Sequence, residues 1–147
     1  MGLCFGIKDA IQLTEEIARN EPVTIFGPLA HNASIQNRLV EKGVQFADKH
    51  QDARTETLIV TAHGTSDRMR REMREAGFQV QDATCPLVHF AHRSLMELVK
   101  EGYYPVIIGK ADHIEVRGLT GDLDTYTIVL NHGDIKKIPN VKRIGIM

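Results

Sequence analysis

The chain has 147 residues, which suits one domain or two small ones and is long enough to bury a hydrophobic core without a metal or disulfide. Its hydrophobic content of 42% and charged content of 25% are ordinary for a globular protein, and its formal net charge of −1 gives no electrostatic reason to expect nucleic acid or an anionic membrane as a partner. No secretory signal or apolar run of membrane-spanning length is present, so the two cysteines indicate a reducing, cytoplasmic location.

Helices and strands are predicted to alternate along the chain. Hydrophobic periodicity predicts helices over residues 7–18, 32–42, 66–76 and 86–101. Short apolar runs predict strands over residues 23–26, 44–46, 57–61, 78–80 and 106–109. The remainder alternates short apolar runs, at 126–130 and 141–146, with turn residues. This alternation indicates an α/β fold with a largely parallel sheet.

Both ends of the sequence look incomplete for such a fold. The segment 2–6 opens a helix with no strand before it, and residues 143–147 lie inside a strand-like run. We therefore expect residues to be missing at both ends. We also expect a boundary near Cys85 that divides the chain into a first α/β lobe, residues 1–85, and an incomplete second lobe, residues 86–147.

Several reactive side chains fall in the short segments between a predicted strand and the next helix, if a strand preceding residue 4 is assumed. They are Cys4, His31, His63, Cys85 and His113, with Glu115 two residues further on. Such segments share the carboxyl edge of a parallel sheet, where α/β proteins bind ligands, and each precedes a helix N-terminus, which favours anions. The placement predicts a site for a negatively charged ligand.

Each of these residues also has a simpler interpretation. A lone cysteine is usually a small buried hydrophobic residue, and a lone histidine in a loop is usually a hydrogen-bonded surface residue. His89 and His92 are three residues apart on a predicted helix, so a metal pair is an alternative to solvated or core-edge histidines. The wide separation of the two cysteines excludes a local zinc ribbon or ferredoxin-type motif. No glycine-rich phosphate loop of a standard type is present.

Five sequence blocks identify a resemblance to a known family. In chain order they are Gly2-Leu3-Cys4-Phe5-Gly6-Ile7, Ala30-His31-Asn32, Thr61-Ala62-His63-Gly64, Asp82-Ala83-Thr84-Cys85-Pro86-Leu87-Val88 and His113-Ile114-Glu115-Val116-Arg117-Gly118. Together they resemble the LytB-type 4-hydroxy-3-methylbut-2-enyl diphosphate reductases of the non-mevalonate isoprenoid pathway. The resemblance implies three similar α/β lobes around a central cluster, of which this chain would hold the first, without its opening strand, and most of the second.

The resemblance also implies roles for the site residues. Cys4 and Cys85 match two of the three cysteines that hold a 4Fe-4S iron–sulfur cluster in the complete family member. His31, His63 and His113 match the histidines of the diphosphate pocket, and Glu115 matches the acid that delivers a proton. The implied reaction is a two-electron, two-proton reductive dehydroxylation that gives isopentenyl and dimethylallyl diphosphates, with ferredoxin or flavodoxin as electron donor.

The sequence departs from the family pattern in ways that leave other functions open. No third cysteine is present. Ile114 stands where many members have proline, and Arg117 where many have glutamate, which we interpret as subfamily variation. The alternatives are a metal-dependent hydrolase that uses cysteine and histidine ligands, and a non-catalytic remnant that binds a diphosphate.

Overall fold

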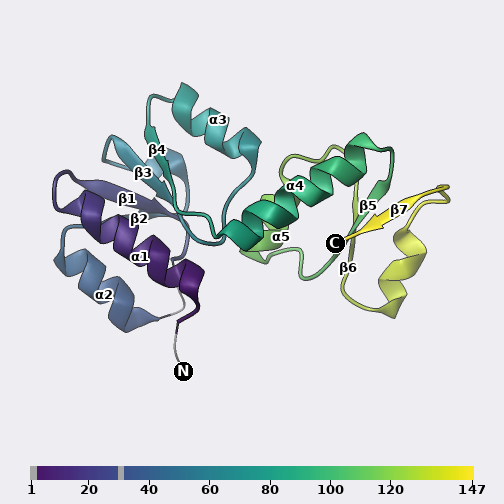
Figure 1. Ribbon diagram of the computed structural model, residues 1–147, viewed down its shortest axis with the longest axis horizontal. Coiled ribbons are helices and arrows are strands. Elements are labelled where there is room, and N and C mark those ends of the chain that lie inside the picture. Colours follow the sequence, from purple (N-terminus) through teal and green to yellow (C-terminus); the bar gives the residue numbers. More distant parts are fainter. Residues whose placement is uncertain (1–2, 30–31) are drawn as a thin grey trace.

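The computed structural model describes residues 3–29 and 32–147. Its elements in chain order are α1 (Phe5–Ala18), β1 (Val23–Phe26), α2 (Ala33–Glu41), β2 (Gln45–Ala47), η1 (His50–Asp52), β3 (Thr57–Val60), α3 (Asp67–Glu75), β4 (Gln79–Asp82), α4 (Pro86–Lys100), β5 (Tyr104–Ile108), α5 (Ile114–Thr120), β6 (Thr127–Val129), η2 (His132–Lys137) and β7 (Ile144–Ile146). The elements form two lobes, α1 to β4 and α4 to β7, which lie side by side in Figure 1.

The first lobe is a parallel sheet with helices on both faces. Its strands are ordered β2-β1-β3-β4, and every neighbouring pair is parallel. Because side chains alternate along a strand, Ile59 of β3 packs in one core with residues of α1 and α2, whereas Leu58 and Val60 pack with Met73 of α3 in another. The central strand β3 is accordingly buried at all four residues, three of which are apolar.

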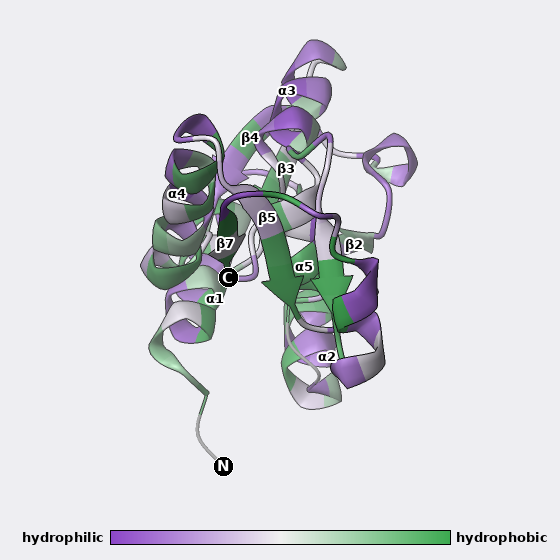
Figure 2. Cartoon of the chain, turned by 90° about the vertical axis from the view of Figure 1, so that its right-hand side faces the viewer, coloured by the Kyte–Doolittle hydropathy of each residue, from purple (hydrophilic) through white to green (hydrophobic). Residues whose placement is uncertain are grey.

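The second lobe is a smaller parallel sheet with the strand order β6-β5-β7. Its central strand β5 is coloured as hydrophobic over much of its length in Figure 2. The core of this lobe brings Ile107 of β5 against Leu95 of α4 and Val116 of α5. The predicted α/β fold with parallel sheets is therefore confirmed, with one sheet in each lobe.

Local signals in the sequence explain several helix ends. Asn32 and Ser66 are the N-caps of α2 and α3, and each side chain accepts a hydrogen bond from the N–H three residues later. The helices α2 and α3 end just before Gly43 and Gly77, which have φ angles of +81° and +95°. Glycine adopts these angles without strain, so these two residues terminate their helices as expected.

The helix α5 follows His113, where the sequence analysis expected a helix but predicted no residue range for it. Its seven residues include three β-branched side chains and Gly118, so its intrinsic helix propensity is low. Burial of Val116 and Gly118 against neighbouring elements compensates for that low propensity.

The helix α4 connects the two sheets. It starts at Pro86, directly after the loop that leaves β4, and packs on β5 and α5. We propose that residues 1–85 and 86–147 are separate domains, with α4 belonging to the second. In the described part of the chain, no helix combines the length and apolarity needed to cross a bilayer.

Candidate functional site

Four of the six predicted site residues line one cavity between the lobes. The cavity has a volume of about 360 Å³, and its lining includes Cys4, His63, Cys85 and Glu115. Cys4 precedes α1, His63 follows β3, Cys85 precedes α4 and Glu115 lies in the first turn of α5. Parallel topology puts the strand-end segments of each lobe at one edge of its sheet, and the structure shows that these edges of the two lobes line the same cavity.

The two cysteines occupy equivalent positions. Cys4 and Cys85 are the N-cap residues of α1 and α4, and neither side chain caps its own helix. Both thiols are free; Cys4 is exposed and Cys85 is half-buried. Each thus stands at the positive end of a helix dipole, where negatively charged groups such as metal-ligating thiolates are favoured.

A glycine allows α1 to approach Cys85 closely. A Cβ atom added to Gly6 would lie 2.8 Å from both Cβ and Sγ of Cys85. No side chain larger than hydrogen fits there unless Cys85 moves. The start of α1 therefore packs directly on one of the candidate ligands.

A polar contact joins the two lobes at the cavity. Nδ1 of His63 lies 3.2 Å from Oε1 of Glu115, and their side chains are 21% and 45% exposed. His63 is held in a tight turn by the hydrogen bond from the N–H of Gly64 to the carbonyl of Thr61. Each side chain is therefore oriented by a partner from the other lobe.

Of the remaining two predicted histidines, one lies among the described residues, and it does not line the cavity. His113 is the N-cap of α5, and its Nδ1 accepts a hydrogen bond from the N–H of Glu115 at 3.3 Å. Its side chain is exposed and does not line the cavity. His31 lies outside the described residues. Their roles in a diphosphate pocket stay predictions.

The histidine pair on α4 has other surroundings. Nε2 of His89 lies 3.4 Å from Oδ2 of Asp82, whereas Nε2 of His92 is buried and has no hydrogen-bond partner among the described residues. Burial, and secondarily the charge of Arg70, lowers the pKa of His92. Across residues 3–29 and 32–147, no group of three or more histidine, cysteine, aspartate or glutamate side chains could hold a metal ion. No contact of the described residues supports the metal-pair alternative.

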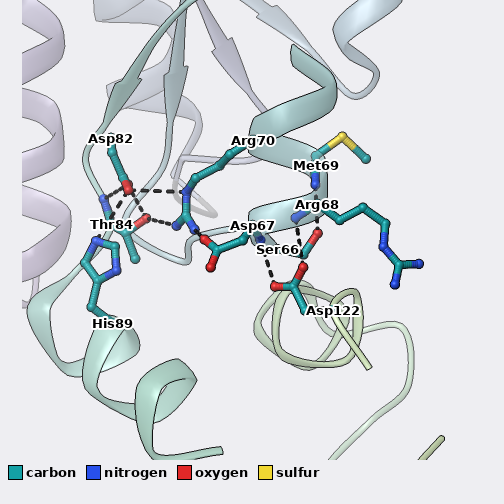
Figure 3. Close-up of polar contacts among 9 residues, drawn as sticks. All are labelled: Ser66, Asp67, Arg68, Met69, Arg70, Asp82, Thr84, His89 and Asp122. Carbon is teal, nitrogen blue, oxygen red and sulfur yellow. Dashed lines mark hydrogen bonds and ion pairs between the residues drawn. The ribbon is translucent and has the colours of Figure 1, made fainter. Parts of the chain in front are cut away.

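Sequence reasoning gave no role to a polar network behind Cys85, shown in Figure 3. Arg70 of α3 is 6% exposed, and its guanidinium lies between Asp82 and Thr84 on one side and Asp67 on the other. Burial alone would raise the pKa of Asp82, but hydrogen bonds from Thr84 and the charge of Arg70 outweigh it and leave that pKa below its usual value. The sequence indicates the burial of Arg70 in one way only: Arg70 lies three residues before the buried Met73, on the same side of the helix.

Sequence reasoning also missed the residue that joins the second lobe to α3. The carboxylate of Asp122 accepts the backbone N–H groups of Asp67 and Arg68 at 2.7 and 2.8 Å. These are the first two N–H groups of α3, which have no partner within the helix. Asp122 thus caps a helix of the other lobe.

Comparisons with known proteins identify relatives of the chain. The family model described as "LytB protein" matches residues 1–147. The 4-hydroxy-3-methylbut-2-enyl diphosphate reductases of Dictyoglomus thermophilum and Aquifex aeolicus are 40% and 33% identical, each over 99% of this chain and 52% and 53% of their own lengths.

Two solved structures of such enzymes have the same fold. The E-1-hydroxy-2-methyl-but-2-enyl-4-diphosphate reductase of Plasmodium falciparum superposes with a TM-score of 0.90 at 29% identity, over 99% of this chain and 47% of that one. An (E)-4-hydroxy-3-methyl-but-2-enyl diphosphate reductase superposes with a TM-score of 0.85 at 35% identity, over 99% and 54%. The chain spans about half the length of the curated relatives it matches. Since the family model matches the whole sequence, the chain belongs to the LytB protein family.

Proposed function

We propose that this chain forms the part of a 4-hydroxy-3-methylbut-2-enyl diphosphate reductase that holds two ligands of an iron–sulfur cluster and the proton-donating acid. The observation that carries the proposal is the convergence of Cys4, Cys85, His63 and Glu115 on one cavity of about 360 Å³. Membership of the LytB family and the names of the relatives support the choice of substrate.

The two thiols fit the implied cluster as part of its donor set. They are free, they line the same cavity, and the packing of Gly6 against Cys85 leaves no room for a competing side chain. Iron–sulfur clusters are held by cysteine thiolates, and such a cluster, when bound, supplies electrons and an iron that can act as a Lewis acid. Because the sequence has two cysteines, a third thiolate of a 4Fe-4S site would come from outside these 147 residues.

The cavity wall suits an allylic diphosphate. Apolar side chains cover one part of it, namely Ile7, Ala62, Leu87, Val88, Ala91 and Leu119. This surface can enclose a five-carbon chain and exclude water from it. The imidazole of His63 lies at the polar part, where a protonated ring donates charge-assisted hydrogen bonds to phosphate. We assign the same binding role to His31 and His113.

Glu115 is the proposed proton donor. Its carboxyl group lines the cavity and contacts the ring of His63, so it lies within reach of a ligand that the histidine binds. A general acid must lie within hydrogen-bonding distance of the atom it protonates, directly or through one water. The contact with His63 fixes the carboxyl group at one side of the cavity.

The partners and location follow from the same proposal. The reduction needs one-electron donors, and we propose ferredoxin or flavodoxin. The two free thiols suit a reducing compartment, so we propose a cytoplasmic location.

Anaerobic reconstitution with iron and sulfide tests the proposal. We expect a brown protein whose visible absorption is lost in Cys4→Ser and in Cys85→Ser and is retained in the surface control His132→Ala. Calorimetric titration with inorganic diphosphate should show binding that weakens in His63→Ala and persists in His132→Ala. A colourless protein that binds zinc through both cysteines would support the hydrolase, and one that binds neither metal but still binds diphosphate would support the non-catalytic remnant.

A further inference from the structure

The candidate ligand Cys85 follows a loop that is attached to a buried arginine. Arg70 lies on α3, which is hydrophilic over most of its length, yet its own side chain is only 7% exposed. Removing a guanidinium from water is costly unless carboxylates and hydrogen bonds surround it. The contacts of Arg70 therefore show what the fold gains from its burial.

The guanidinium group contacts Asp82, the last residue of β4, and Thr84, which immediately precedes Cys85, as drawn in Figure 3. Nη2 donates to Oγ1 of Thr84 at 3.2 Å, and Nε lies 3.3 Å from Oδ2 of Asp82. The third contact, from Nη1 to Oδ1 of Asp67 at 2.7 Å, stays within the first turn of α3. Two of its three contacts thus join α3 to the end of β4 and the β4–α4 loop, one as a hydrogen bond to Thr84 and one as an ion pair with Asp82 that lacks hydrogen-bond geometry.

The loop itself is organised by Asp82. Its Oδ1 accepts the N–H of Thr84 at 3.0 Å and also the hydroxyl hydrogen of Thr84. The hydroxyl of Thr84 can therefore accept from Arg70 and donate to Asp82 at the same time, which satisfies a side chain that is 7% exposed. This arrangement fixes the residue that immediately precedes Cys85.

Other contacts leave Thr84 and Cys85 little freedom on their remaining sides. A Cβ atom on Gly64 would lie 2.9 Å from Cγ2 of Thr84, so the backbone at Gly64 packs directly on the threonine methyl group. The N–H of Cys85 donates to the carbonyl of Ala62 at 3.0 Å. Arg70 closes the side of Thr84 that these contacts leave open.

We propose that Arg70 is a positioning residue, which holds the Cys85 thiol at the cavity by fixing the Asp82–Thr84 loop to α3. The importance of that thiol as a ligand rests on the proposed function. The positioning itself is a property of the chain without any cluster. Loss of Arg70 releases the loop locally, because Thr84 loses a donor and Asp82 loses a counter-charge.

The reactivity of Cys85 tests the proposal directly. In a Cys4→Ser background Cys85 is the single thiol, so its rate of reaction with a disulfide reagent can be measured on the apo protein. We expect Arg70→Met to raise this rate by about tenfold, the change that follows from losing one charge-assisted hydrogen bond. Arg70→Lys keeps the charge without the planar fork and should give an intermediate rate. Arg74→Met, an exposed change on the same helix, should leave the rate unaltered.

Amide hydrogen exchange separates local positioning from general destabilisation. In Arg70→Met, exchange should accelerate at Thr84 and Cys85, while Leu58 and Ile59 in the central strand keep the protection of the parent. If Arg70→Met does not fold, Thr84→Val removes the same contact from the other side and should give the same local pattern. An unchanged thiol rate, or exchange that rises equally in the central strand, would overturn the proposal. Neither readout needs a cluster, so a failure of iron–sulfur reconstitution would count against the proposed function alone.

Discussion

Replacing Gly6 by alanine tests how closely α1 packs on Cys85. The new Cβ atom would lie 2.8 Å from Cβ and Sγ of Cys85, whereas heavy atoms in ordinary contact lie about 3.5 Å or more apart. The substitution must therefore displace the cysteine, the helix or both by about 0.7 Å. Overpacking of this kind costs about 1–3 kcal/mol.

Alanine also favours the helix, which reduces the expected cost. Its propensity exceeds that of glycine by up to about 1 kcal/mol, and by less at Gly6, which is only the second residue of α1. The net expectation is a protein less stable by about 1–2 kcal/mol, with a melting temperature lower by about 2–4 °C for each kcal/mol.

Urea titration followed by circular dichroism measures this change, and Gly118→Ala is the matched control. Gly118 also lies in a helix, but the nearest atom to its added Cβ, Nε2 of His92, is 3.5 Å away, so this variant should be as stable as the parent or slightly more stable. In a Cys4→Ser background, Gly6→Ala should also change the reaction rate of Cys85. A Gly6→Ala protein with unaltered stability and an unaltered thiol rate would refute the close packing.

Three further changes test other parts of the structure. Asp122→Asn weakens the cap that the second lobe provides for α3, so it should lower the free energy of unfolding by about 1 kcal/mol and speed hydrogen exchange of the first two amides of α3. The control Asp124→Asn, at a side chain that is 94% exposed, should change neither quantity. Burial lowers the pKa of His92, so protonation of this ring favours the unfolded chain. The free energy of unfolding should therefore fall as the pH drops below about 6.5. His92→Gln should remove that part of the pH dependence in urea titrations. Gly64→Ala places a side chain on a backbone with φ of +72° and only 2.9 Å from a threonine methyl group, so it should lower stability in thermal melts by about 2–4 kcal/mol. Gly43→Ala should cost only about 1 kcal/mol, because φ there is +81° but no atom lies within 4 Å of the added Cβ. Equal pH dependence with and without His92, or equal losses in the two glycine variants, would contradict these assignments.

Much of the fold could be predicted because its signals are local. The strand β3 consists of β-branched and apolar residues and carries no charged side chain, which is typical of a parallel strand buried on both faces. The rule that parallel strands share one carboxyl edge then placed Cys85, His63 and Cys4 near one another, and the structure puts these side chains around one cavity. Their chemical roles stay predictions.

The network behind the site could not be predicted, because its members look like surface residues. The helix α3 carries four arginines, and its packing against β4 shows that Arg70 is the buried one. Asp122 follows α5 in a run that contains a second aspartate two residues later, and its contact with α3 depends on how the lobes meet. Periodicity describes single elements, so contacts between elements that are far apart in sequence remain hidden.

The geometry of the candidate site depends on contacts that lie outside it. The thiols belong to N-caps of helices in both lobes, and the acid Glu115 belongs to the second lobe, so the cavity forms only while the lobes keep one relative orientation. The contact between His63 and Glu115 cannot hold that orientation alone, because both side chains are partly exposed and such pairs contribute at most about 1 kcal/mol. Asp122 accepts two backbone hydrogen bonds at a helix N-terminus, a geometry that is directional and is strengthened by the helix dipole. Asp122 does not line the cavity that His63 and Glu115 share, yet we expect Asp122→Asn to loosen the contact between these two residues. The change should be seen by NMR as a shift of the His63 ring resonances. Unaltered resonances would show that the lobes are held by other contacts.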